Sequence, residues 1–187
     1  MIIVRNLHFM SFKQGTQVAL RPLEIKDLDM LYEWENDPDV MQAGNNLTPY
    51  SRFYLEQYIL GAGNNIYVDR QLRMVIENLK GEVVGLADLF DFDPRHRRAA
   101  VGILIGKPYR NRGYAAESLD LVIEYADQTL GLKQLFCTVD AGNNASGALF
   151  RKKGFVHTGT RRQWNLRGRD WVDEDILQLI FDRDGRK

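Results

Sequence analysis

The sequence predicts an α+β fold in which helices flank a mixed, mostly antiparallel central sheet. Two observations predict this fold class. The spacing of the apolar residues first predicts helices, then a run of strands, and finally strands that alternate with helices. The 187 residues contain no linker, repeat or low-complexity tract, and 44% of them are hydrophobic, which suits one domain with a buried core. We therefore assign residues 1–187 to a single domain, with 1–17 as an N-terminal extension.

The first part of the chain is expected to form a strand and two helices. A short strand covers 18–23, and helical spacing over 27–36 ends at Asp37-Pro38. A second helix is predicted to begin at Thr48-Pro49, because Thr suits the N-cap and Pro the first helical position.

The middle of the chain predicts an antiparallel meander. Its strands cover 73–77, 82–92 and 99–105, and the first two flank a four-residue turn that contains Gly81.

The remaining elements alternate between helix and strand until a final hairpin. They are a helix over 114–129, a strand over 135–139, a helix over 144–153, and hairpin strands over 162–166 and 171–180.

Charge, cysteine content and hydropathy exclude several classes of protein. Twenty-five basic residues balance twenty-five acidic ones, which argues against a general nucleic-acid binder. The single cysteine, Cys137, cannot form an internal disulfide or a zinc cage, and its apolar surroundings indicate a buried side chain. No run approaches the ~20 apolar residues of a membrane span. We expect a cytoplasmic protein without a metal or a membrane partner.

The segment from Arg110 to Ala115 has the chemistry of a phosphate site. It joins a strand to a helix, whose first N–H groups are unpaired and lie at the positive end of the helix dipole. Gly113 permits close approach of the backbone, and Arg110 and Arg112 add donors. The spacing matches neither a Walker motif nor a dinucleotide fingerprint. On these six residues alone, an ordinary turn before a helix explains the pattern about as well.

Further segments resemble one family, the GNAT superfamily of N-acetyltransferases, whose signature is Arg/Gln-x-x-Gly-x-Gly/Ala at a helix start. Phe150 to Phe155 is similar to the family's Tyr-Arg-Lys-x-Gly-Phe helix end, and Asn143 stands where many members place an Asn that contacts the coenzyme. The opening from Leu20 to Glu24 is also similar. The residues His96 to Ala99 resemble the branch of spermidine and ribosomal-protein acetyltransferases. The likeness extends from about Val18 to Ile180.

The resemblance implies a fold, a co-substrate and a set of contacts. The strand 101–105, which precedes the phosphate segment Arg110 to Ala115, splays from strand 135–139, and acetyl-CoA lies in the V-shaped gap. An amine acceptor enters over the first two helices and the final hairpin. A homodimer is expected by this resemblance only. The residues assigned to the coenzyme are Ile103, Leu104, Ile105, Arg110, Asn111, Arg112, Gly113, Tyr114, Ala115 and Asn143.

The resemblance fails at both usual catalytic positions. Ala100 stands where members often carry a Glu base, and Phe150 where they carry a Tyr acid. Three interpretations remain open. The first gives catalysis to other groups, with Asp88 and Tyr109 as the assigned candidates and Asp91 and Tyr114 as further ones. The second lets orientation of an already neutral amine suffice, and the third makes the protein a non-catalytic acyl-CoA-binding module. The leading expectation is acetyl transfer to a small-molecule amine or a protein N-terminus.

Overall fold

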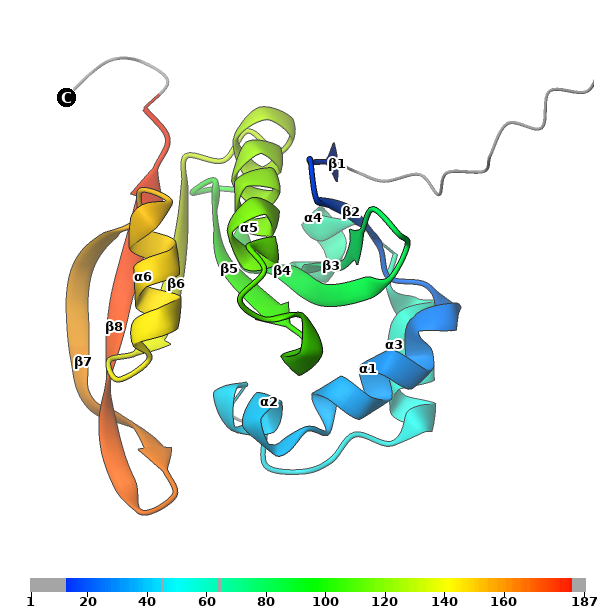
Figure 1. The fold of residues 1–187 in the computed structure, drawn as a ribbon. Coiled ribbons are helices and arrows are strands. Elements are labelled where there is room, and N and C mark those ends of the chain that lie inside the picture. The colour runs from blue at the N-terminus through cyan, green and yellow to red at the C-terminus, as the bar shows by residue number, and fades with distance from the viewer. Residues whose placement is uncertain (1–12, 45, 64, 183–187) are drawn as a thin grey trace, which may run out of the picture.

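A single eight-stranded sheet forms the centre of the molecule in a computed structural model that describes residues 13–44, 46–63 and 65–182 (Figure 1). The strand order is β1-β2-β3-β4-β5-β6-β8-β7, and every neighbouring pair is antiparallel except β5 and β6. The predicted α+β class with a mixed, mostly antiparallel sheet is confirmed. The strands are β1 (Lys13–Gln14), β2 (Val18–Pro22), β3 (Leu72–Asn78), β4 (Val83–Asp93), β5 (Arg98–Ile105), β6 (Gln134–Asp140), β7 (Val156–Arg167) and β8 (Asp170–Ile180).

Helices cover both faces of this sheet. The helical elements are η1 (Ile25–Asp27), α1 (Leu28–Glu35), α2 (Pro38–Ala43), α3 (Arg52–Gly61), α4 (Ile66–Asp69), η2 (Lys107–Tyr109), α5 (Tyr114–Glu124), η3 (Tyr125–Thr129) and α6 (Asn144–Lys152). A large core lies under α5, where Leu119 and Val122 pack against Leu89 and Val101 of the sheet. A smaller core lies on the opposite face, under α1 and α3. The two faces therefore offer two separate surfaces to ligands.

Alternation along β4 decides which side chains face which surface. Ala87 and Leu89 point into the core under α5, whereas Leu86 belongs to the core under α1 and α3. Successive strand residues point to opposite faces, so Asp88 and Phe90 share the α1/α3 face with Leu86.

Two predicted boundaries were wrong, and one helix was missed. α1 ends at Glu35, before Asp37-Pro38, as predicted, but Pro38 also begins α2, because Asp37 is extended and its carboxylate accepts from the Asp39 N–H at 2.9 Å. The second long helix starts after Ser51, not at Thr48-Pro49, since the Ser51 hydroxyl caps the Tyr54 N–H at 3.1 Å.

The other wrong boundary is the start of the final hairpin. β7 begins at Val156, six residues before the predicted 162. Most of its side chains are exposed, so its sequence lacks the apolar alternation that marks a half-buried strand.

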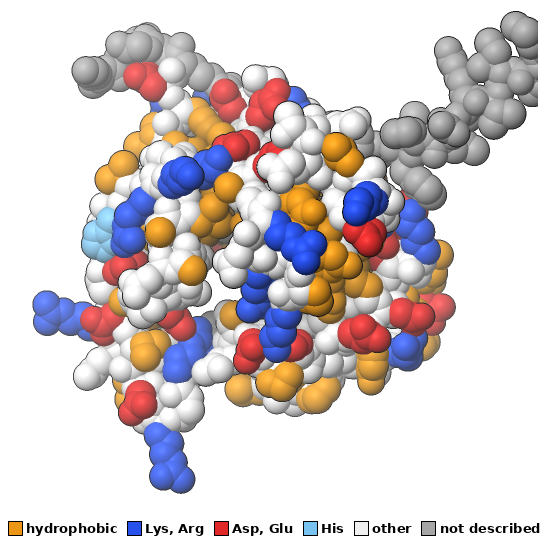
Figure 2. All heavy atoms as spheres, viewed as in Figure 1, with side chains coloured by type: hydrophobic (Ala, Val, Ile, Leu, Met, Phe, Trp, Pro, Cys, Tyr) orange, Lys and Arg blue, Asp and Glu red, His pale blue; other side chains and the backbone are white. Residues whose placement is uncertain are grey.

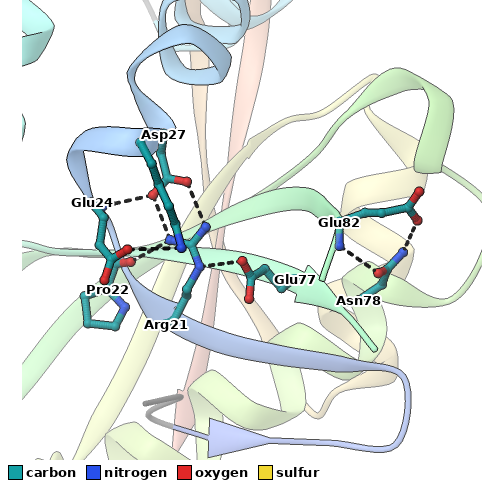
Figure 3. A network of polar contacts seen from close by, with 8 residues as sticks. Arg21, Pro22, Glu24, Asp27, Glu77, Asn78 and Glu82 are labelled. Atoms are coloured by element: carbon teal, nitrogen blue, oxygen red, sulfur yellow. Dashed lines mark hydrogen bonds and ion pairs between the residues drawn. The ribbon is translucent and has the colours of Figure 1, made fainter. Parts of the chain in front are cut away.

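A buried ionic network joins β2, η1 and β3 (Figure 3). Arg21 is 2% exposed and donates through both terminal nitrogens to Asp27, each at 2.7 Å, and through Nε to Glu77 at 2.6 Å. Burial alone would lower the pKa of Arg21, but hydrogen bonds to Asp27 and Glu77 outweigh it and raise that pKa. The network fixes where α1 begins relative to the sheet.

The surface carries both signs of charge. Figure 2 shows basic and acidic side chains interspersed over the face drawn, in keeping with the balanced composition. Among the helices of the described residues, none has the length and apolarity to cross a bilayer. The same residues contain no group of three or more His, Cys, Asp or Glu side chains arranged to hold a metal ion.

Candidate active site

The sheet opens at one place, between β5 and β6. These parallel strands pair only from Arg98↔Gln134 to Ala100↔Phe136. β5 continues to Ile105 against β4, and β6 continues to Asp140 against β8, without further pairing to each other. The predicted V-shaped splay is confirmed. It leaves one edge of residues 101–105 of β5 free to pair with an extended ligand.

The three β5 residues predicted to contact the coenzyme line this open edge. Ile103 and Ile105 pack toward the core under α5, and Leu104 packs toward the opposite core. The Ile105 carbonyl accepts from Nε of Arg110 at 3.1 Å, so Arg110 folds back onto the end of β5. Arg110 thereby connects the splayed strand to the loop that follows it.

The loop and helix start after β5 form a cradle of unpaired amides. Asn111 and Gly113 have φ values of 62° and 84°, which turn successive N–H groups toward one side. Within the described residues, no backbone hydrogen bond is made by the N–H groups of 111–115, whereas those of Ala116 and Glu117 donate to the Gly113 carbonyl. The cradle suits a diphosphate, as the sequence predicted.

The cradle is supported by a hairpin that the sequence did not reveal. The Glu117 carboxylate accepts from the Thr16 backbone N–H, from the Thr16 hydroxyl at 3.0 Å, and from the Gln17 N–H at 2.9 Å. The turn between β1 and β2 therefore packs against the first turn of α5. These hydrogen bonds turn the Glu117 carboxylate, which lies near the proposed anion site, toward donors of the β1–β2 turn.

Asn143 is the N-cap of α6, and its Oδ1 accepts from the Ser146 N–H at 3.1 Å. Its side-chain nitrogen has no partner among the described residues and remains available as a donor. The predicted coenzyme contact at Asn143 is compatible with this geometry and stays a prediction.

The α1/α3 face beside the splay carries a half-buried charge cluster. Asp88 lies opposite Gly102 of β5 and accepts from Nε of Arg73 at 2.8 Å. Arg73 also donates to Glu35 of α1 at 2.6 Å, and its guanidinium lies 5.7 Å from the Tyr58 ring centroid. Burial alone would lower the pKa of Arg73, but the charge of Asp88 and the hydrogen bond to it raise that pKa well above its usual value. The sequence offered Asp88 as a candidate, and Glu35 as one of four acidic residues at the end of the first helix that could attract a cationic amine, but it gave no sign of Arg73.

A cavity of about 510 Å³ lies over this cluster. Its lining residues are Asp69, Arg70, Gln71, Arg73, Asp88, Phe90, Asp91 and Gly102. A bulge in β4 gives Asp91 a φ of 49° and places it in this wall. A second cavity of about 340 Å³, under the end of α3, shares three of these residues and extends the space away from the splay.

The two predicted catalytic candidates lie on opposite faces of the sheet. Asp88 faces the cavity, whereas Tyr109 packs against the core under α5, with Arg112 5.8 Å from its ring centroid. Ala100 is buried opposite Phe90, and Phe150 is buried against Phe155. Neither Ala100 nor Phe150 offers a proton donor or acceptor. The roles of Asp88 and Tyr109 stay predictions.

The model of the acetyltransferase (GNAT) domain matches residues 17–156. The chain belongs to the GNAT acetyltransferase family. It is an N-acetyltransferase whose co-substrate is acetyl-CoA, as the resemblance predicted.

Relatives place this GNAT protein on the spermidine acetyltransferase side of the family, which confirms the predicted branch. A spermidine N(1)-acetyltransferase of Escherichia coli K12 is 32% identical over 142 residues, covering 76% of this chain and 74% of the relative. An L-amino acid N-acetyltransferase of the same strain is 25% identical, covering 88% of this chain and 99% of the relative.

A solved structure shares the fold. The crystal structure of spermidine N-acetyltransferase from Vibrio cholerae in complex with CoA and spermine superposes with a TM-score of 0.80. It is 23% identical, and the match covers 89% of this chain and 96% of that chain.

Proposed function

We propose that this GNAT protein transfers the acetyl group of acetyl-CoA directly to a small-molecule primary amine. One observation supports this most strongly: the open edge of β5 has the amide cradle at its end and an acidic cavity on the α1/α3 face beside it. A thioester held along that edge and an amine held in the cavity would meet at the splay.

On the coenzyme side, the cradle residues would bind by backbone. The N–H groups of Asn111 to Ala115 would hold the pyrophosphate, with Arg110 and Arg112 adding charge. The free edge at Ile103, Leu104 and Ile105 would pair with the pantetheine amides. Asn143 would donate through its free side-chain nitrogen.

On the acceptor side, charge favours a small cation. Three carboxylates and two guanidinium groups line the larger cavity, and Glu35 adds a carboxylate through Arg73. Asp91 makes no hydrogen bond or ion pair with the described residues, whereas Asp88 already accepts from Arg73 and Gln71. We assign Asp88 and Asp91 to binding the ammonium form of the acceptor. The second cavity gives room for the rest of a flexible amine, so polyamines and amino acids both belong in the test.

The chemistry requires little from side chains. After the bound ammonium loses its proton to solvent, the amine nitrogen attacks the thioester carbonyl carbon and forms a C–N bond. The C–S bond then breaks, the amide loses its extra proton, and the coenzyme leaves as a thiolate that solvent protonates. Orientation of the two reactants can supply ~7–11 kcal/mol of the barrier, so the loss of an acid and base at Phe150 and Ala100 is compatible with turnover.

Release of coenzyme thiol over a panel of polyamines, amino acids and N-terminal peptides tests the activity. Cys137 does not interfere, because it is buried and burial raises the pKa of its thiol to about 12. We expect turnover with at least one small amine. Coenzyme binding without turnover of any acceptor would favour the alternative, a non-catalytic acyl-CoA-binding module.

The pH profile tests whether the protein supplies a base. If the protein supplies no base, kcat/KM for the amine rises about tenfold per pH unit until the pH reaches the pKa of the amine, ~10 for an alkyl amine. Asp88→Asn should raise the acceptor KM and leave this slope unchanged. Asp120→Asn, on the exposed side of α5, is the control. A lower break in the profile that disappears only in Asp88→Asn would instead make Asp88 the base.

A further inference from the structure

The short helix α2 lies across the open end of the splay (Figure 1). β5 and β6 diverge after Ala100↔Phe136, so no sheet hydrogen bond joins their far ends. The six residues of α2 are about 9 Å long at 1.5 Å per residue. One end of α2 contacts the segment after β5, and the other contacts the end of β7.

The first anchor is ionic and exposed. Nζ of Lys107 lies 2.8 Å from Asp37 and 3.0 Å from Asp39, at the start of α2. The hydrogen bond from Lys107 lowers the pKa of Asp37. Solvent screens this contact, because the Lys107 side chain is 51% exposed.

The second anchor is better enclosed and connects three elements. Arg167, at the end of β7, donates to Asp140 at the end of β6 through Nε at 2.6 Å and Nη2 at 3.0 Å. Its Nη1 donates to the Gln42 carbonyl of α2 at 2.7 Å. That carbonyl is one of those a helix leaves unpaired at its C-terminus. The side chains of Arg167 and Asp140 are only 17% and 25% exposed.

A second hydrogen bond fixes the Asp140 carboxylate itself. Asn165 of β7 donates to Asp140 at 2.8 Å and to Glu174 of β8 at 3.2 Å. The anchor on α2 is therefore held by the body of the hairpin, not by one mobile side chain. A displacement of Arg167 would release α2 from β6 and β7 together.

We infer that Arg167 is a positioning residue for acetyl transfer, because it holds α2 across the open end of the splay, the gap in which the thioester and the amine are proposed to meet. This inference rests on the proposed function, in which the amine approaches from the α1/α3 face. Among the described residues, no hydrogen bond or ion pair joins Arg167 to residues 110–115, so we expect its effect to fall on the acceptor kinetics and not on coenzyme affinity.

The test compares two arginines of the same strand. Arg167→Met removes the link to α2. Arg161→Met removes a similar ion pair, with Glu174 at 2.8 Å, that has no contact with α2. We expect Arg167→Met to lower kcat/KM for the best amine on the order of ten- to a hundredfold, with the acetyl-CoA Kd unchanged. Arg167→Lys, which keeps one charged donor, should recover part of the loss, and Arg161→Met should leave both constants near wild type.

Hydrogen exchange provides a readout that does not need turnover. The amides of residues 38–44 should exchange faster in Arg167→Met than in wild type or Arg161→Met. If Arg167→Met and Arg161→Met match in both exchange and acceptor kinetics, the inference is wrong and the proposed function stands. If the wild type turns over no amine, the proposed function fails, and exchange alone decides whether Arg167 holds α2.

The pH of these assays does not disturb the anchor. The hydrogen bond from Arg167 lowers the pKa of Asp140 below its unfolded value of ~3.9. Its contribution to stability is therefore present above about pH 4 and is lost only as the pH falls through the folded pKa. Measurements between pH 6 and 9 compare the variants with Asp140 ionised.

Discussion

Gly113 gives the sharpest residue-scale test of the coenzyme site. It is the N-cap of α5 with a φ of 84°, and a Cβ built there would lie 3.7 Å from the nearest atom, in the Gln17 side chain. Gly113→Glu therefore has room but places a negative charge among the cradle amides. We expect coenzyme binding to be lost in calorimetry, because like charge and bulk both oppose the pyrophosphate.

The positive φ of Gly113 also strains any L side chain, so a control must carry the same strain. Gly81 has a φ of 79°, lies in the turn between β3 and β4, and has no atom within 4 Å of a built Cβ. Gly81→Glu should lose ~1 kcal/mol of stability and bind coenzyme normally. Equal coenzyme affinity in the two variants would remove the diphosphate from this cradle.

Residue patterns predicted the coenzyme side of the site better than the acceptor side. The cradle is contiguous, so Arg110 to Ala115 carry their geometry in one stretch of sequence. The acceptor cluster is assembled from distant elements: Glu35, Arg73 and Asp88 meet only because β3 and β4 pair and α1 crosses them. No local signal marks Arg73, because an arginine at that position is ordinary for a strand.

At the scale of elements, capping chemistry decides where α3 starts. Ser51 caps the Tyr54 N–H, whereas the Thr48 hydroxyl makes no hydrogen bond within the described residues. Ser51→Ala should reduce the free energy of unfolding by ~1 kcal/mol in urea titrations. Thr48→Ala should change it by less than ~0.5 kcal/mol. If Thr48→Ala lost more free energy of unfolding than Ser51→Ala, the helix start that the sequence predicted would be restored.

The elements that the sequence predicted correctly are those with one dominant signal. Apolar spacing located β3, β4, β5, α6 and the continuous helical run of α5 and η3 within a residue or two. Gly131 and Gly154 stop the helices with φ values of 65° and 89°. The elements that it missed have competing signals. Asp37-Pro38 suits either a helix end or an N-cap followed by the first helical residue, and only the contacts of α2 with Lys107 and Arg167 select the second.

At the scale of the whole molecule, the proposed function requires two binding surfaces, one on each face of the sheet, to stay aligned. In that proposal the coenzyme side depends on α5, and the acceptor side on α1 and α3. The two surfaces meet only at the gap between β5 and β6. The position of α1 relative to the sheet is therefore a property on which both substrates depend.

The Arg21 network sets that position, and its removal is the last test. Arg21→Met leaves Asp27, which is 3% exposed, buried without its cation (Figure 3). We expect a loss of ~3–5 kcal/mol in the free energy of unfolding, measured in urea. Combining it with Asp27→Leu should recover much of that loss, because the buried Asp27 carboxylate is then removed and only Glu77, whose side chain is 18% exposed, has lost its cation. Arg52→Met, which breaks the exposed pair with Asp29, should have little effect. If Arg21→Met proved as mild as Arg52→Met, the start of α1 would be held by apolar packing alone.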